Sequence, residues 1–255
     1  MKLKKFILSS ILSLGLFNSS VQAAPNVPLF IEEYQNLLSI MLASYKESVK
    51  APLDSRIFDI SKPQYYNFLK NSTHREYHQS FLAMLFYNDF KVNNKPTNFC
   101  FILFDGKKTK ELEQYLFQTF HRAEETIEYL VAHEFGHCIA AHQRVLGKIK
   151  EQHNDKQEEQ IADMFAIGFF LTRGQDQAAK SVIRQIEQVP EDDIHFNPIA
   201  LKKFYYIFKK DNPKIKNIYE LFNVSFDYFQ KINDNPEFLS KEIEDSKDSK
   251  DSKDK

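Results

Sequence analysis

The sequence predicts an α+β fold that is mostly helical and contains a small β-sheet. Residues 29–49, 110–145 and 158–171 each have the length and the mixed composition of a helix, and two or three more helices follow up to about residue 239. The clearest strand is Phe99–Phe104, which is apolar on both faces and therefore needs cover on both sides. A chain of 255 residues, 42% of them hydrophobic, is long enough for one or two domains with a buried core.

In the N-terminal half, the predicted helix at 29–49 ends before Pro52, and residues 56–60 fit a short strand. The aromatic-rich residues 65–90 are expected to be mostly helical. Asn93–Pro96 has the composition of a turn, and the Asp-Gly pair at 105–106 ends the strand at 99–104.

In the C-terminal half, Gly147 is a plausible end for the predicted helix at 110–145. Residues 153–156 form a polar linker, and the helix at 158–171 ends near Gly174. From Lys241 onwards the chain repeats Asp-Ser-Lys with almost no apolar residues, so residues 241–255 are expected to be a disordered tail.

Residues 1–23 have the composition of a secretory signal peptide. Three early lysines precede the apolar run Phe6–Phe17, which is short for a membrane span, and Val21–Ala23 offers small residues at a cleavage site before Ala24. An uncleaved N-terminal anchor is the alternative. We therefore expect a signal peptide at 1–23, one domain at 24–240, and a periplasmic or secreted protein.

No later apolar run approaches membrane-spanning length, so no stable membrane insertion is expected after signal cleavage. The net charge of −1 gives no basic surplus that would indicate nucleic-acid binding. Cys100 and Cys138 are the two cysteines, and in an exported protein they permit one disulfide. Two buried free thiols are the alternative.

The residues that carry chemistry begin with His133-Glu134-Phe135-Gly136-His137. On a helix, residues four apart lie about 40° from each other around the axis, so His133 and His137 can bind one Zn²⁺ from the same face. Glu134 lies beside them and can take a proton from metal-bound water. The opposite side of this helix is apolar and should face the core: Ile127, Val131, Phe135, Cys138 and Val145.

The predicted helix at 158–171 begins with acidic residues and offers the rest of the site. Catalytic zinc usually has three protein ligands and a water, and Glu159 can supply the third. Asp163 lies four residues later and can accept the free N–H of a ligand histidine. Glu158 is the rival ligand, but its partner at four residues is Ala162. The alternative is a solvated acidic helix start, which suits the helix dipole.

His-Glu-x-x-His followed by Glu-x-x-x-Asp resembles the gluzincins, the thermolysin-like branch of zinc peptidases, over about residues 125–170. The resemblance implies a zincin-like domain whose small sheet packs on the first motif helix. It also implies zinc-dependent hydrolysis of a peptide or protein substrate. Because zincins place the sheet there, Cys100 in the predicted strand and Cys138 on the core face are expected to lie near one another.

Further downstream, residues 193–195 (Asp-Ile-His), 203–206 (Lys-Phe-Tyr-Tyr) and 211–213 (Asp-Asn-Pro) are similar in order to a family of exported bacterial metallopeptidases. The chain departs from that pattern at Lys203, where the family has arginine, and lacks the glycine of the last turn. In gluzincins a downstream His or Tyr often stabilises the oxyanion. His195 and Tyr205 are the candidates for that role by resemblance.

The other histidines are expected to be structural or solvated. His142 points away from His133 on the same helix and is predicted to be a core residue. His153 is expected to be solvated, and the pair His74 and His78 to lie on an exposed helix face rather than to bind a second metal. Two other functions stay open, a non-enzymatic zinc-stabilised binding protein of the envelope and a helical interaction module with an accidental motif. The oligomeric state does not follow from the sequence.

Overall fold

The computed structural model describes residues 27–60, 82–92, 94–104 and 123–235. The expected signal peptide at 1–23, the expected tail at 241–255 and the His74–His78 pair lie outside these residues. The described elements are α1 (Val27–Ser48), β1 (Leu53–Asp59), β2 (Leu82–Val92), β3 (Lys95–Phe104), α4 (Ala123–Val145), α5 (Asp155–Thr172), α6 (Asp176–Ile186), α7 (Pro198–Asp211) and α8 (Ile218–Asp234). Among them, no helix is both long and apolar enough to cross a membrane.

The three described strands form one sheet in the order β1-β3-β2, with β1 parallel and β2 antiparallel to the central β3. Cys100, Ile102 and Phe104 of β3 join the main core together with residues of α4. Phe99, Phe101 and Leu103 belong to a second cluster on the other face. Both faces of β3 are therefore buried, and the predicted α+β fold is confirmed.

The expectation of helix for residues 65–90 is wrong over residues 82–90, which belong to β2. Met84 and Phe86 belong to the main core, whereas Leu85 belongs to the second cluster and Tyr87 packs against it. This alternation has the period of a strand, and the hydrogen bonds to β3 satisfy its backbone. Aromatic content alone did not distinguish the two structures. Residues 65–81 lie outside the described part.

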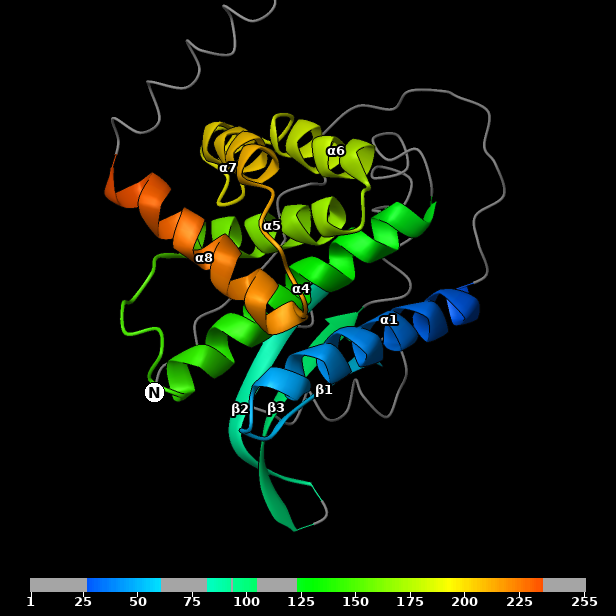
Figure 1. Ribbon diagram of the computed structural model, residues 1–255. Coiled ribbons are helices and arrows are strands. Elements are labelled where there is room, and N and C mark those ends of the chain that lie inside the picture. Colours follow the sequence, from blue (N-terminus) through cyan, green and yellow to red (C-terminus); the bar gives the residue numbers. More distant parts are fainter. Residues whose placement is uncertain (1–26, 61–81, 93, 105–122, 236–255) are drawn as a thin grey trace, which may run out of the picture.

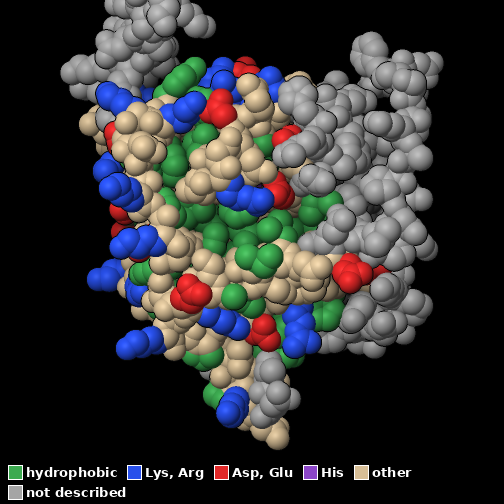
Figure 2. Space-filling model, turned by 45° about the vertical axis from the view of Figure 1, so that its right-hand side comes forward, with side chains coloured by type: hydrophobic (Ala, Val, Ile, Leu, Met, Phe, Trp, Pro, Cys, Tyr) green, Lys and Arg blue, Asp and Glu red, His purple; other side chains and the backbone are tan. Residues whose placement is uncertain are grey.

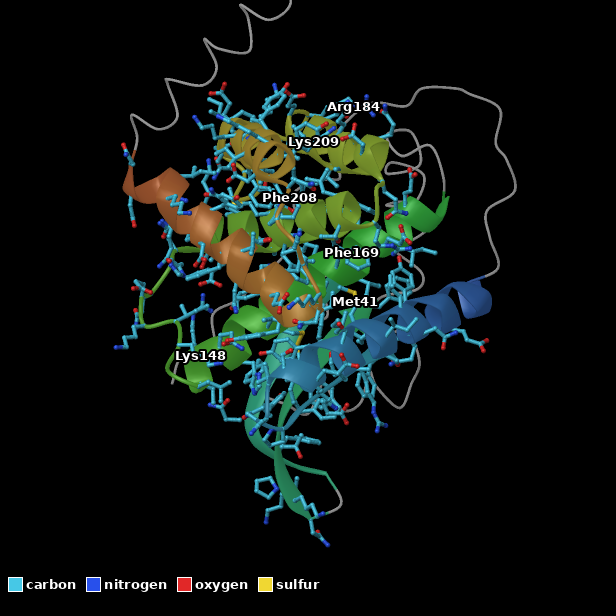
Figure 3. All side chains as sticks on the ribbon, in the orientation of Figure 1. Met41, Lys148, Phe169, Arg184, Phe208 and Lys209 are labelled. Carbon is cyan, nitrogen blue, oxygen red and sulfur yellow. A yellow bond between two sulfur atoms is a disulfide. The ribbon has the colours of Figure 1, made fainter. Side chains whose placement is uncertain are left out.

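The helices build outward from the sheet in layers (Figure 1). α4 lies against β2 and β3, α5 packs on α4, and α6, α7 and α8 pack on α5. α5 is consequently the most enclosed helix, with every residue from Glu158 to Phe170 buried. Figure 3 shows Met41 and Phe208 within the helical layers, whereas Lys148 and Arg184 extend outward.

α5 begins with a capping box, in which the Asn154 side chain accepts from the Gln157 backbone N–H and the Gln157 side chain accepts from that of Asn154. The helix therefore starts inside the segment expected to be a linker. Gly147 and Gly174 follow α4 and α5 with φ of 68° and 71°, as expected for glycines that end helices.

A disulfide joins Cys100 of β3 to Cys138 of α4, with the two Cα atoms 5.8 Å apart. Both halves of the expectation, proximity and a bridge, hold in the structure. Because Cys138 directly follows His137, the bridge fixes the middle of α4 to the central strand.

Candidate metal centre

α4 supplies two histidines from one face, one helical turn apart. His133 Nε2 lies 3.2 Å from His137 Nε2, and the two rings are nearly perpendicular with centroids 4.8 Å apart. The i, i+4 spacing produces this arrangement, with Phe135 and Cys138 of the opposite face held in the core. Val145, which was also expected to face the core, is 41% exposed because it is the last residue of α4.

α5 brings a carboxylate to the same point. Glu159 Oε2 lies 3.1 Å from His133 Nε2 and 3.3 Å from His137 Nε2. The three atoms thus form a nearly equilateral triangle. Tetrahedral zinc with bonds of about 2.0–2.1 Å would separate its ligand atoms by roughly 3.3 Å. Among the described residues these three side chains form the group that could hold a metal ion, and their donor types and spacing fit zinc.

The outer nitrogen of His133 is held by Asp163, also from α5. His133 Nδ1 lies 2.8 Å from Asp163 Oδ1, and the Tyr129 hydroxyl donates to the same oxygen at 3.0 Å. A proton on Nδ1 leaves Nε2 free for a metal, which is the arrangement expected from the sequence. Tyr129 was missed, although it lies four residues before His133 and therefore on the same face of α4.

Small residues allow the two helices to approach closely enough for these contacts. A Cβ added at Gly136 would lie 3.2 Å from Ala162 Cα and 3.2 Å from Phe165 Cδ1. Gly136, which lies between His133 and His137 in the sequence, therefore permits the close approach of α4 to α5.

All the polar side chains of this centre are buried, with His133, Glu134, His137, Glu159 and His195 each between 1% and 5% exposed. Accordingly, no histidine surface is visible on the face in Figure 2, where hydrophobic side chains fill the middle of the view. Burial raises the pKa of the Glu134 carboxyl, against the opposing effect of His133 and His137. Burial also opposes ionisation of Glu159, but the surrounding histidines hold its pKa well below the usual range.

His195 lies beside the cluster. Its Nδ1 is 3.2 Å from Glu159 Oε2, and its backbone N–H donates to Asp193 Oδ1 at 2.9 Å. It does not belong to the three-residue group whose ligand atoms all lie within 4.8 Å of one another. His195 Nε2 is buried and has no hydrogen-bond partner within the part of the chain that the structure describes. The structure thus brings His195 to the centre without making it a fourth ligand.

Tyr205 is placed differently. Its hydroxyl donates to Asp176 Oδ1 of α6 at 2.7 Å, in a network with Lys209, whose ammonium also donates to Asp176 at 2.7 Å. This contact occupies the hydroxyl in the packing of α7 on α6. The structure therefore does not bring Tyr205 to the cluster.

Glu158, the rival ligand, binds other partners. It accepts from Arg144 Nη2 and lies 3.6 Å from His153 Nδ1. The expectation that His153 is solvated is wrong, because its ring packs edge-on against Phe226 and Phe229 of α8 and is buried. The segment before α5 is covered by α8, and the polar composition of this segment does not indicate that cover.

His142 is a core residue, as predicted. Its Nδ1 is hydrogen-bonded to the Tyr45 hydroxyl at 2.9 Å, and its ring packs against those of Tyr45 and Phe86. Burial, with a smaller contribution from Lys148, lowers the pKa of His142 to about 4. His142 is therefore neutral at ordinary pH and takes no part in the metal centre.

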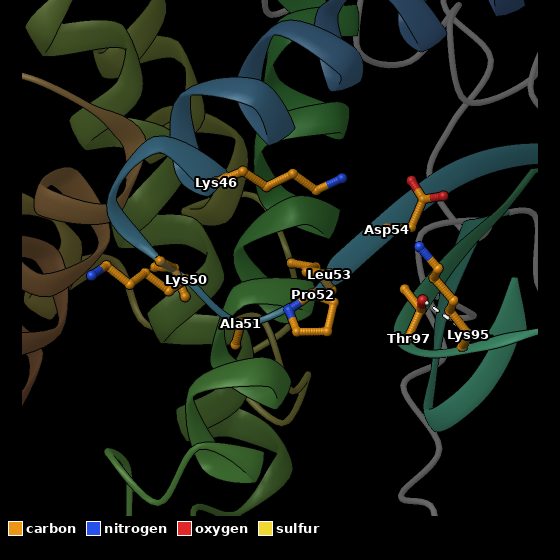
Figure 4. A pocket seen from close by; sticks show the side chains of 9 residues that line it. Lys46, Lys50, Ala51, Pro52, Leu53, Asp54, Lys95 and Thr97 are labelled. Atoms are coloured by element: carbon orange, nitrogen blue, oxygen red, sulfur yellow. Dashed lines mark hydrogen bonds between the residues drawn. The ribbon is translucent and has the colours of Figure 1, made fainter.

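A surface pocket of about 590 Å³ lies elsewhere, where the end of α1 meets β1 and β3 (Figure 4). Lys46, Lys50 and Lys95 line it together with Asp54 and Thr97, and none of the cluster residues does. Among the described residues that line it, Asp54 is the only one with a carboxylate, imidazole or thiol side chain.

Comparison with known proteins agrees with this geometry in part. Residues 95–190 match the model of a family described as Peptidase U49. No curated protein and no solved structure matches the chain. The matched segment is shorter than half of the 255-residue chain. It contains β3, α4 and α5, and hence the ligand triangle and both cysteines, whereas His195 lies beyond it. What the match establishes is the similarity of this segment to a peptidase family.

Proposed function

We propose that the protein is an exported zinc-dependent metallopeptidase of the gluzincin type. The observation that carries the proposal is the triangle of His133, His137 and Glu159, whose edges of 3.1–3.3 Å suit one tetrahedral zinc with a free fourth position. The similarity of residues 95–190 to a peptidase family supports peptide hydrolysis as the reaction.

The charges of the centre support a divalent cation. Glu159 and Asp163 are both fully enclosed carboxylates, and buried charges are costly unless they are paired. Burial disfavours the charged form of His133, but the Asp163 and Glu159 carboxylates hold its pKa well above its usual range, so without a metal the centre draws a proton onto this imidazole. A dication bound by Glu159, with Asp163 behind His133, would balance the two carboxylates and leave the histidines in the neutral form that binds metal.

The chemistry then follows from the neighbouring side chains. Zinc held by the three ligands would polarise the scissile carbonyl and acidify a bound water. Glu134, which is not in the ligand group, can accept the proton of that water and deliver it to the leaving amine. Burial moves its pKa toward neutrality, which suits a group that both accepts and donates a proton.

His195 is the better of the two candidates for stabilising the oxyanion. Its Nδ1 faces the Glu159 carboxylate, and in the imidazolium form, which carries a proton on both ring nitrogens, its Nε2 can donate a hydrogen bond to a developing negative charge. Tyr205, whose hydroxyl is bound to Asp176, is not assigned a role in the reaction.

The main alternative is a non-enzymatic zinc-stabilised binding protein of the envelope. The deep burial of the whole cluster favours it, since structural zinc sites are closed to substrate. Against it, metal binding alone does not need the Glu134 carboxylate, and three protein ligands leave one coordination position open.

Export is supported by the sequence of residues 1–23 and by the Cys100–Cys138 disulfide, because disulfides persist mainly in oxidising compartments. Fractionation of cells that make the full-length protein tests this part. Recovery of the uncleaved chain in the cytosol, with free thiols, would contradict it.

The decisive experiment combines metal analysis with cleavage of a diverse peptide library. We expect one zinc per chain and cleavage by the wild type, whereas Glu134→Gln should keep the zinc and lose on the order of 10²–10⁴ in rate. Glu128→Gln is the matched control, because Glu128 lies on the same helix but pairs with Arg173. Zinc binding without cleavage of any peptide would favour the binding protein, and failure to take up zinc would refute both functions.

A further inference from the structure

The chain presents two adjacent glutamates, Glu158 and Glu159, at the start of the helix that completes the metal centre. Both are buried, and both are chemically able to bind a metal. Only Glu159 Oε2 lies within reach of both ligand histidines. Something must therefore hold the Glu158 carboxylate elsewhere.

Arg144 and His153 do so. Arg144 lies in the last turn of α4, seven residues after His137, and its guanidinium donates to Glu158. His153 stands just before the N-cap of α5, with Nδ1 3.6 Å from the Glu158 carboxylate and 3.3 Å from Arg144 Nη2. The His153 ring is fixed in turn by the aromatic side chains of α8. Glu158 thus has two partners, Arg144 and His153, that do not belong to the triangle.

We propose that Arg144 is a positioning residue that keeps Glu158 out of the metal centre and so makes Glu159 the metal ligand. The proposal rests on zinc binding as described above. If Arg144 were removed, the Glu158 carboxylate would be left buried without its strongest partner. A buried unpaired charge is costly, and the nearest strong cation would be the metal one residue away.

This role differs from that of an ion pair that only joins two helices. In such a pair, removal of either partner has the same effect on zinc binding. In the proposed role, loss of Arg144 is harmful because Glu158 remains, whereas loss of the Glu158 charge is harmless. The Arg144 side chain is 29% exposed and can be solvated when its partner is gone.

The test measures zinc affinity by competition with a chelator, together with the visible absorption of the Co²⁺-substituted protein. We expect Arg144→Met to weaken zinc binding roughly 10–100-fold, as loss of an outer hydrogen-bond partner does, and to change the Co²⁺ spectrum. Glu158→Gln should change affinity less than about fivefold. The double variant Arg144→Met/Glu158→Gln should recover the affinity and the spectrum of Glu158→Gln, because no competing carboxylate remains.

Arg173→Met is the matched control. Arg173 pairs with Glu128 at 2.8 Å and joins the same two helices at their other end, so its loss should lower stability without altering zinc affinity or the spectrum. If Arg144→Met does not fold, comparison of the double variant with Glu158→Gln tests the proposal, because the double variant lacks both charges.

The proposal is overturned if Arg144→Met binds zinc as the wild type does, or if Glu158→Gln and the double variant are as weak as Arg144→Met. Absence of zinc from the wild type would instead refute the proposed function before any variant is compared.

Discussion

Gly136→Ala tests whether the close approach of α4 and α5 builds the metal centre. The added Cβ would lie 3.2 Å from Ala162 Cα and 3.2 Å from Phe165 Cδ1. Alanine in a helix gains about 1 kcal/mol over glycine, whereas an overpacked core site costs about 1–3 kcal/mol. Because one contact is backbone, α5 itself must move. We therefore expect a net loss of up to about 2 kcal/mol in the free energy of unfolding.

The same shift would move Glu159 away from the two histidines, so zinc affinity should fall by roughly tenfold. Urea unfolding of the metal-free protein and competition with a chelator measure the two effects separately. Gly168→Ala is the control, because its Cβ would meet side-chain ends and no backbone atom: Leu221 Cδ1 at 3.0 Å and Ser225 Oγ at 3.1 Å on α8, and Phe204 Cζ at 3.5 Å on α7. A Gly136→Ala protein that is at least as stable as the wild type and binds zinc equally well would refute the reasoning.

Three further predictions follow from the buried polar groups and the disulfide. Tyr129→Phe removes the second donor to Asp163 and should weaken zinc binding by up to about tenfold in a chelator competition, with the fold retained. The pKa of His142 is lowered to about 4 in the folded protein, so its contribution to stability is present above pH 6.5 and is lost as the pH falls from about 6.5 through 4. Urea unfolding should show a loss of up to about 2 kcal/mol from this group between pH 7 and pH 5, and His142→Gln should lack that part of the slope. Reduction of the Cys100–Cys138 bridge, which spans 38 residues, should cost about 4 kcal/mol of unfolding free energy, whereas an unchanged midpoint would show that the bridge is absent in solution.

The predictions from the sequence were most accurate where all the residues of a motif lie on one helix. The spacing of His133 and His137, and that of Glu159 and Asp163, was sufficient to place each pair on one face, because the helical period fixes it. The strand at 99–104 was evident from its continuous apolar run. In contrast, residues 82–90 were misassigned because aromatic side chains suit both a buried strand and a helix, and only pairing with β3 decides between them.

The features that the sequence did not reveal depend on contacts between elements. His153 lies in a polar segment, and nothing local indicates that α8 covers it. Tyr205 is one helical turn before Lys209, but its use of Asp176 as a partner depends on how α7 packs on α6. For His195, the order of residues suggested a role, and the position beside Glu159 arises from the turn in which Asp193 accepts its backbone N–H.

The register of α4 against α5 is what joins these local patterns into one centre. The two helices run antiparallel, with the pairs Arg144–Glu158 and Arg173–Glu128 at their two ends, and the contact of Gly136 with Ala162 between these pairs fixes how far one helix is shifted along the other. A shift of one residue along a helix is about 1.5 Å, which is large compared with ligand separations of 3.1–3.3 Å. The helical period can therefore identify the candidate ligands of each helix, but the packing of Gly136 against Ala162 is what brings Glu159 to the histidines, and Arg144 is proposed to hold Glu158 aside.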